Sequence, residues 1–250
     1  MPYDLDIPGQ VSEFELRAIE LVASLVPQDG CIVEVGSLFG RSSWAWAKSV
    51  DPSVTVYCVD PWRKNAGIRP MEERFGITYG IEEFRKNTAD CDNIEPLQGY
   101  SPHDFADWHQ PIDLYYDDAV HQDPGFSDNL EFWASHLKPH GILCGDDFRP
   151  RFPDICNGVQ KYAEKLEREL ITVDFFWCLL PGDQEDDGAK EVANKLRALA
   201  SEKIRVETSR SPQIAVHILS DVRAEVGQRS ARLPVRLTNL RRTPWPDHDE

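Results

Sequence analysis

The sequence predicts an α/β fold: a Rossmann-like, doubly wound and mostly parallel sheet of seven strands flanked by helices. Three observations predict it. Short apolar segments alternate with segments of helical period, glycine or proline turns separate them, and acidic residues recur where the apolar segments end. Alternation of strand and helix favours parallel strands joined by right-handed crossovers. Ligands of such sheets bind beyond the carboxyl ends of the strands, where the acidic residues would lie.

The first strand and the turn after it are the most informative segment. Cys31–Val35 is an apolar strand interrupted by Glu34, and a glycine turn from Gly36 to Gly40 leads into a helix. The free amides at that helix start can accept an anion, and the Glu34 carboxylate suits an amino group. The spacing differs from the dinucleotide motif G-x-G-x-x-G, because Leu38 stands where a glycine is required. A purely structural turn is the alternative, since every parallel sheet needs such turns.

Two further elements flank this segment. Ser12–Glu15 has the form of a capping box and predicts a helix that ends near Leu25. Val54–Val59 predicts a second buried strand, and Asp60 follows it about 20 residues after the glycine turn, where nucleotide-binding folds grip a ribose. The alternative for Asp60 is capping of a turn.

The next stretch is less regular. Residues 61–80 show no clean period and predict a long loop at the binding edge, a candidate lid or substrate loop. A helix over 81–87 and a third strand over Ile94–Gln98 follow. Ser101 then either caps a short helix or hydrogen-bonds an adenine, and the sequence favours neither.

The fourth and fifth strands each end on two aspartates. Ile112–Asp118 ends on Asp117 and Asp118, and the strand from Ile142 runs into Asp146 and Asp147. Alternation along a strand sends Asp117 and Asp118 to different faces. Two carboxylates about 4 Å apart repel by roughly 4 kcal/mol at an effective dielectric near 20, so such a group takes up protons, spreads apart or holds a cation. Carboxylate oxygens suit Mg²⁺, Ca²⁺ or Mn²⁺, whereas capping of turns is an equal alternative.

The rest of the chain predicts three helices and two more strands. A helix begins at Asp123-Pro124, and two others precede predicted strands near Val173–Leu179 and Ile214–Leu219. We therefore predict one domain over residues 1–220. Residues 221–250 form a basic C-terminal extension, either an edge strand or the start of a further domain, and its arginines are expected to be solvated.

Composition excludes several classes of protein. The net charge of -16 argues against a nucleic-acid or anionic-membrane partner, because phosphate attraction needs surplus Lys and Arg. The six cysteines show neither zinc spacing nor a disulfide framework, and four lie in predicted strands as small apolar residues. With no signal peptide and no apolar run near the ~20 residues of a membrane span, we expect a cytoplasmic protein.

The pattern E-x-G-x-x-x-G-R-S from Glu34 to Ser42 resembles the first motif of class I S-adenosylmethionine-dependent methyltransferases. Residues 31–160 are similar to the small-molecule O-methyltransferases of that class, including the catechol, caffeoyl-coenzyme A and macrocin types. The resemblance implies S-adenosyl-L-methionine as cofactor and a divalent metal, with Mg²⁺ expected. The implied cofactor-binding residues are Glu34, Gly36, Ser37, Gly40, Ser42, Asp60, Ser101 and Asp118. The implied metal ligands are Asp118, Asp146 and Asp147.

The chain departs from these families at two positions. Catechol-type enzymes carry a lysine base three residues after the metal aspartate, and this chain has His121 there. Sugar-type enzymes commonly read D-G-D, and this chain has Asp118-Ala-Val. Histidine suits a base, because its ordinary pKa of about 6.5 lets it accept a proton near neutrality. A structural role for His121 is the alternative.

We therefore predict an S-adenosylmethionine-dependent O-methyltransferase acting on a hydroxyl of a sugar or secondary metabolite, with His121 and Asp118 as catalytic residues and a divalent ion assisting. One alternative is a methyltransferase without metal, in which His121 is the base. Another is a catalytically silent binding domain of the same fold. The predicted partner is a small-molecule acceptor, without nucleic acid or membrane, and a homo-oligomer is left open.

Overall fold

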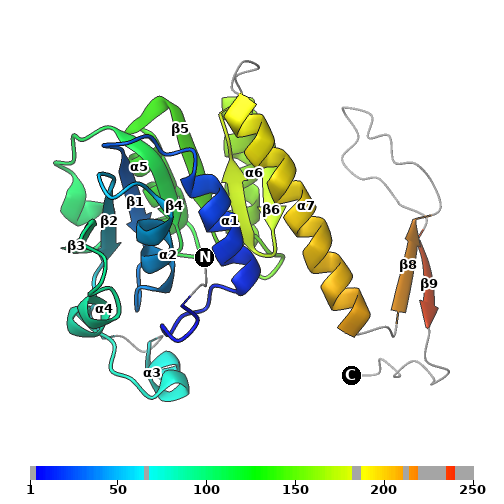
Figure 1. The fold of residues 1–250 in the computed structure, drawn as a ribbon, viewed down its shortest axis with the longest axis horizontal. Coiled ribbons are helices and arrows are strands. Elements are labelled where there is room, and N and C mark those ends of the chain that lie inside the picture. Colours follow the sequence, from blue (N-terminus) through cyan, green and yellow to red (C-terminus); the bar gives the residue numbers. More distant parts are fainter. Residues whose placement is uncertain (1–3, 65–67, 182–186, 211–213, 219–234, 240–250) are drawn as a thin grey trace. The chain divides into compact units, whose positions relative to one another are not determined.

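The computed structural model describes residues 4–64, 68–181, 187–210, 214–218 and 235–239 (Figure 1). The chain divides into two compact units, Met1–Ala200 and Ser201–Glu250. The predicted domain boundary at residue 220 lies outside the described residues and stays a prediction.

The first unit is built on a seven-stranded sheet in the order β3-β2-β1-β4-β5-β7-β6. The strands are β1 Cys31–Val35, β2 Thr55–Asp60, β3 Ile94–Gln98, β4 Ile112–Asp117, β5 Leu137–Gly145, β6 Leu170–Val173 and β7 Phe176–Leu179. The first five strands pair in parallel, and β7 lies antiparallel between β5 and β6. The predicted mostly parallel, Rossmann-like sheet is confirmed.

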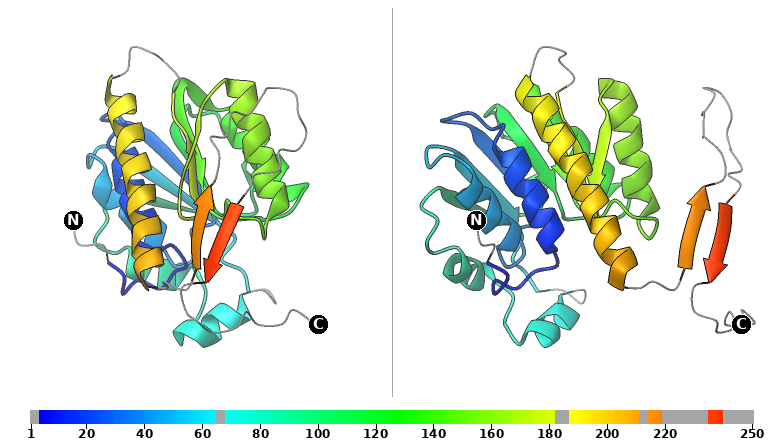
Figure 2. Two further views of the ribbon diagram at one scale, coloured as in Figure 1. Left: turned by 90° about the vertical axis from the view of Figure 1, so that its right-hand side faces the viewer. Right: turned by 45° about the vertical axis from the view of Figure 1, so that its right-hand side comes forward.

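Helices cover both faces of the sheet (Figure 2). The bounds are α1 Glu13–Ala23, α2 Arg41–Ser49, α3 Arg69–Phe75, α4 Ile81–Asn87, the 3₁₀ turn η1 His103–Phe105, α5 Gly125–Ala134, α6 Pro153–Leu166 and α7 Asp187–Arg210. One apolar core lies between the sheet and α1, α2 and α7, and the other lies between the sheet and α5 and α6. Burial on both faces explains why β1 and β4 are apolar along their whole length.

Local signals placed several of these elements correctly. Ser12 caps α1 as predicted: its Oγ accepts from the Glu15 N–H at 3.4 Å, and its own N–H donates to Glu15 Oε2 at 2.5 Å. The strand register brings the carboxyl ends of β1, β2 and β4 level with one another, because Val35 at the end of β1 lies opposite both Val59 and Asp117. The residues that follow these three strand ends are therefore neighbours.

Two expectations about the sheet were wrong in detail. The segment expected as one strand over Val173–Leu179 is the hairpin β6–β7, which turns at Asp174 with φ 56°. A two-residue turn inside a continuous apolar run is hard to detect, because aspartate tolerates the left-handed conformation without a glycine signal. The hairpin thus completes the seven strands of the sheet. The strand predicted over Ile214–Leu219 is β8, Ile214–Ile218, which belongs to a separate two-stranded sheet.

The expected loop over residues 61–80 contains α3, with Pro70 in its first turn and Gly76 after its end. None of the seven residues of α3 is buried, so no apolar stripe indicated a helix. The fifth strand, expected from Ile142, begins five residues earlier, at Leu137.

In the second unit, β8 Ile214–Ile218 pairs antiparallel with β9 Val235–Asn239. The C-terminal extension, for which an edge strand was one expectation, thus contains the strand β9, paired with β8 in a two-stranded sheet. Most of the basic residues expected to be solvated lie outside the described residues, namely Arg223, Arg229, Arg232, Arg241 and Arg242.

Candidate active site

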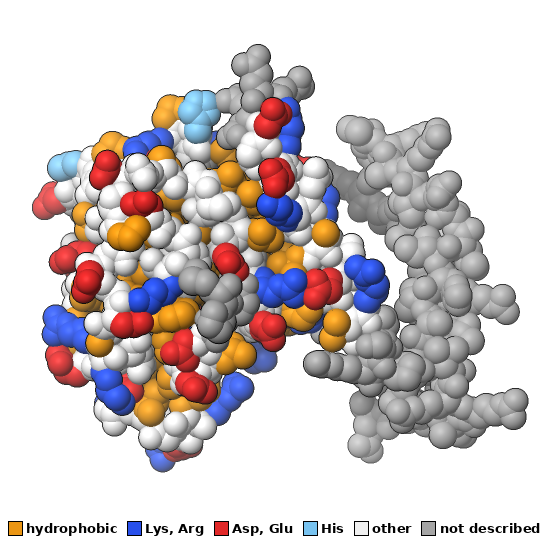
Figure 3. Space-filling view, in the orientation of Figure 1, with side chains coloured by type: hydrophobic (Ala, Val, Ile, Leu, Met, Phe, Trp, Pro, Cys, Tyr) orange, Lys and Arg blue, Asp and Glu red, His pale blue; other side chains and the backbone are white. Residues whose placement is uncertain are grey.

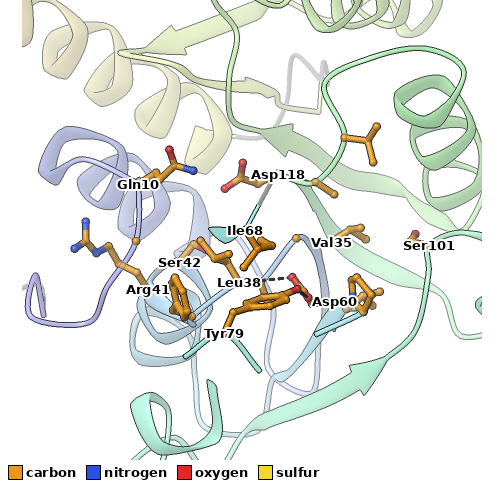
Figure 4. A pocket seen from close by; sticks show the side chains of 18 of the residues that line it. Gln10, Val35, Leu38, Arg41, Ser42, Asp60, Ile68, Tyr79, Ser101 and Asp118 are labelled. Atoms are coloured by element: carbon orange, nitrogen blue, oxygen red, sulfur yellow. Dashed lines mark hydrogen bonds between the residues drawn. The ribbon is translucent and has the colours of Figure 1, made fainter. Parts of the chain in front are cut away.

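A cavity of about 330 Å³ opens at the carboxyl ends of β1, β2, β3 and β4 (Figure 4). Its wall includes seven of the residues singled out from the sequence: Gly36, Ser37, Ser42, Asp60, Ser101, Asp118 and His121. Four others lie outside its lining: Glu34, Gly40, Asp146 and Asp147. The cavity thus brings together the candidate binding residues of four strand ends.

The glycine turn forms the floor of this cavity. Gly36 has φ 98°, and its N–H donates to the Val59 carbonyl at 2.9 Å. A Cβ at Gly36 would lie 2.1 Å from the backbone oxygen of Asp118, so only glycine fits between the ends of β1 and β4. Gly40 has φ 97° and precedes α2, whose first residues Arg41 and Ser42 line the cavity.

Arg41 fastens the N-terminal segment over the cavity. Its Nε donates to the Ile7 carbonyl at 2.7 Å, and its Nη1 donates to the Val11 carbonyl at 3.0 Å. The intervening residues Pro8–Val11 belong to the cavity wall. This segment had no motif, so the sequence offered no reason to assign it to the site.

Glu34 lies beneath the turn rather than in the cavity. Its side chain is 0% exposed, and the Ser43 hydroxyl donates to its Oε2. Burial raises the pKa of Glu34, and the hydroxyls of Ser42 and Ser43 oppose that shift. Its predicted contact with the cofactor stays a prediction, and its position favours bracing of α2 against β1.

Asp60 lies in the cavity wall with three protein donors. Its Oδ2 accepts from the Leu38 N–H at 3.0 Å, and its Oδ1 accepts from the Trp62 N–H at 2.7 Å and from the Tyr79 hydroxyl. Burial raises the pKa of this carboxyl, whereas the three donors lower it. Oδ2 keeps capacity for a second donor, which is compatible with the predicted ribose contact. Tyr79 had no signal in the sequence, because it lies within the aperiodic stretch 61–80.

Asp117 and Asp118 diverge as alternation predicted. Asp117 accepts from the Tyr115 hydroxyl on the α5 side of the sheet, and burial raises its pKa to about 6. Asp118 lines the cavity instead. Its pKa is raised well above the ordinary value, first by burial and then by the charges of Asp146 and Asp147.

His121, Asp147 and Arg149 form a chain of contacts at the rim. His121 Nε2 lies 2.6 Å from Asp147 Oδ2, and Arg149 Nη2 contacts the other oxygen of the same carboxylate. The His121 ring stacks on Phe152, with 4.3 Å between centroids and 15° between planes. Contacts on two sides orient the imidazole. Arg149, which packs over Phe152 and Phe175, was not singled out from the sequence.

A possible ligand set for a cation differs from the predicted one in one member. Asp118, His121 and Asp147 each offer a ligand atom, and these atoms lie within 4.8 Å of one another. Asp146 is not in this group; its Oδ1 accepts from the Asp147 N–H at 2.7 Å. Burial raises the pKa of Asp146, and the charge of Glu15 raises it further.

Asn129 of α5 is a wall residue that the sequence did not indicate. Its side chain is 1% exposed, and neither its Oδ1 nor its Nδ2 has a hydrogen-bond partner in the described part of the chain. Nearby, Ser101 Oγ accepts from the Trp133 indole N–H at 2.8 Å. The predicted candidate Ser101 therefore lies on the same side of the cavity as an unpaired amide.

One face of the molecule carries both signs of charge (Figure 3). Acidic and basic side chains of the described residues are interspersed over the face shown in Figure 3. None of the described helices combines the length and apolar character that crossing a membrane requires.

The sequence and the fold are similar to those of known methyltransferases. Residues 33–148 match the family model described as a methyltransferase domain. The fold is similar to CalS11, a calicheamicin methyltransferase, with a TM-score of 0.50 and 17% identity over 69% of this chain and 82% of that chain. No curated protein sequence gives a significant match.

Two other solved structures are similar to a comparable degree. A methyltransferase from Geobacter sulfurreducens has a TM-score of 0.49 and 21% identity, over 68% of this chain and 79% of that chain. The O-methyltransferase TomG from Streptomyces achromogenes, solved with S-adenosylmethionine, has a TM-score of 0.48 and 20% identity, over 69% and 82% of the two chains.

Proposed function

We propose that this chain is a class I S-adenosylmethionine-dependent methyltransferase that transfers the methyl group to a hydroxyl of a small-molecule acceptor, a sugar or secondary metabolite; the match of residues 33–148 to a methyltransferase-domain model supports this. One observation carries the proposal. The cavity at the strand ends has a carboxylate-paired histidine, His121, in its wall. That pair is suited to removing a proton from an acceptor hydroxyl.

The donor substrate fits the cavity through groups of known chemistry. The start of α2 offers backbone N–H groups for the methionine carboxylate, and Asp60 Oδ2 can accept from a ribose hydroxyl. Asp118 supplies negative charge on the wall near the glycine turn, which favours the ammonium and sulfonium groups. Glu34 lies beneath the turn and does not line the cavity.

His121 serves as the base in this proposal. Asp147 accepts from His121 Nε2, which leaves Nδ1 to take the proton. As the acceptor oxygen attacks, the new O–CH₃ bond forms while the S–CH₃ bond breaks, and the products are a methyl ether, S-adenosylhomocysteine and the proton held by His121. Asp147 stabilises the imidazolium and fixes its orientation. The sequence assigned this partnership to Asp118, whereas the contact geometry favours Asp147.

A divalent ion is the second candidate for activating the acceptor. The ligand atoms of Asp118, His121 and Asp147 are close enough to share one ion. Burial, and then the charges of Asp146 and Asp147, raise the pKa of Asp118. An ion held by these residues would act as a Lewis acid and would lower the pKa of the acceptor hydroxyl. A set with one nitrogen and two oxygens suits Mn²⁺ or Fe²⁺ better than the expected Mg²⁺.

Arg149 competes with that ion. It already contacts one oxygen of Asp147, so the protein supplies its own positive charge there. The two candidates are exclusive for His121, because a histidine bound to a metal through its free nitrogen cannot take the proton. We favour the base.

Two measurements test the proposal. The purified chain should bind S-adenosylhomocysteine in calorimetry, and it should transfer labelled methyl from S-adenosylmethionine to members of a panel of glycosides and phenols. Activity that persists in EDTA supports His121 as base, and activity lost in EDTA and restored by Mn²⁺ supports the ion. Absence of S-adenosylhomocysteine binding would favour the silent binding domain. The cytoplasmic location and a homo-oligomeric state stay predictions.

A further inference from the structure

Asn129 is a buried polar side chain that the proposed chemistry does not use. It belongs to the wall of the cavity, it is 1% exposed, and both polar atoms of its amide lack a partner among the described residues. Buried amides in folded proteins are nearly always hydrogen-bonded, because an unmade bond there costs free energy. An unpaired amide in a cavity wall therefore indicates a ligand group that completes it.

The position of Asn129 shows which end of the cavity it serves. Asn129 lies four residues before Trp133 and so on the same face of α5, and the Trp133 indole donates to Ser101 Oγ at 2.8 Å. Figure 4 places Ser101 on the opposite side of the cavity from Arg41 and Gln10, with Asp60 between them. Asn129 therefore lies beyond the proposed ribose position, away from the start of α2.

The chemistry of this end suits a flat heterocycle. Val35, Val59 and Ala119 give the wall apolar surface, and Asn129 adds one donor and one acceptor held in a plane. The adenine edge carries an exocyclic amine beside a ring nitrogen, and an asparagine amide matches that pair. An apolar wall with a single bidentate polar group is the arrangement expected for a purine.

We propose that Asn129 recognises the adenine of the methyl donor: Oδ1 accepts from the exocyclic amine and Nδ2 donates to the adjacent ring nitrogen. The inference rests on the proposed function, since it assumes that the donor occupies the cavity. It adds a residue that determines specificity for the base and that lies outside the glycine-turn motif.

Asn129→Leu is the variant that tests this. Leucine has a similar size and no polar atoms, so the variant without ligand should unfold at or above the wild-type midpoint, because an unsatisfied amide has been removed. A lower midpoint would show that the amide has a structural partner and would count against the proposal. If the leucine variant does not fold, the smaller Asn129→Ser replaces it in the same comparison.

Binding is measured by calorimetry with two ligands: S-adenosylhomocysteine and its analogue in which hydrogen replaces the adenine amine. The wild-type protein should bind S-adenosylhomocysteine about 10- to 100-fold more tightly than the analogue, and the leucine variant should lose most of that difference. If Asn129→Leu lowers the affinity for both ligands by the same factor, Asn129 only shapes the cavity. If the variant binds both ligands with wild-type affinity, Asn129 has no role in binding. Either result overturns the inference while leaving the proposed function standing. No wild-type binding of S-adenosylhomocysteine would instead refute the proposed function itself.

Discussion

Replacement of Gly36 by alanine tests the geometry on which the site depends. Gly36 lies where β1 meets the end of β4, and an added Cβ would stand 2.1 Å from the Asp118 oxygen and 2.5 Å from its carbonyl carbon. Ordinary contact begins at 3.4 Å, so the two strand ends must separate by about 1.3 Å. The Asp118 side chain and the cavity floor move with them.

Two penalties add in this variant. A non-glycine residue at φ 98° costs about 1–2 kcal/mol, and relieving the clash within a packed sheet costs roughly 1–3 kcal/mol more. We therefore expect Gly36→Ala to lower the free energy of unfolding by about 2–5 kcal/mol. Because a misplacement of about 1 Å costs on the order of 100-fold in rate, methyl transfer should fall by at least that factor where the variant folds.

Gly76→Ala is the matched control. Gly76 also has positive φ, at 67°, but nothing lies within 4 Å of its added Cβ. It therefore carries the backbone penalty alone, about 1–2 kcal/mol, and should keep wild-type affinity for S-adenosylhomocysteine. Urea unfolding and calorimetry on both variants give the comparison. Gly36→Ala with the same stability as Gly76→Ala and unchanged ligand affinity would refute the reasoning.

Four other substitutions have defined outcomes. His121→Ala should slow methyl transfer by about 10²–10⁴-fold at unchanged S-adenosylhomocysteine affinity, and a loss below tenfold would rule out the base. Asp60→Ala should weaken S-adenosylhomocysteine binding by about tenfold or more in calorimetry, and equal affinity would remove its ribose contact. Arg149→Met should raise Mn²⁺ affinity if the guanidinium competes for Asp147, and titration with Mn²⁺ showing no change would exclude that competition. Glu34→Gln should be more stable than wild type near neutral pH. Burial raises the folded-state pKa of Glu34, so folding favours the protonated carboxyl. The contribution of this protonated group to the free energy of unfolding is fully present below about pH 4.5, and it is lost as the pH rises through the folded-state pKa. Urea unfolding at pH 5 and pH 8 should therefore show the advantage of the glutamine variant growing with pH, and a constant difference would contradict this.

The sequence alone predicted the sheet and its binding edge, because those depend on local patterns. The apolar β1 and β4, the Ser12 capping box and the glycine turn are each determined within a few residues. Acidic residues after parallel strands must gather at one edge, and the structure brings Asp60 and Asp118 to one cavity. The methyltransferase assignment came from the same short segment, in which spacing alone separates this motif from dinucleotide motifs.

Other features depended on contacts between distant segments. The segment expected as one strand over Val173–Leu179 forms the two strands β6 and β7, and β8 pairs with β9 rather than with the seven-stranded sheet, because strand pairing is decided by packing rather than by apolar character. The sequence paired His121 with Asp118 by spacing, whereas the backbone turn at Asp147, with φ 63°, directs that carboxylate to His121 and Arg149.

Asn129 is the clearest case of a feature that only the tertiary structure decided. In the sequence it is a polar residue within an amphipathic helix, a position usually exposed to water. Only the fold shows that α5 presents it to the cavity, 1% exposed and without a partner in the described part of the chain. Local pattern determines which segments become strands and helices, but the unmet hydrogen bonds of a cavity exist only once those segments have packed together.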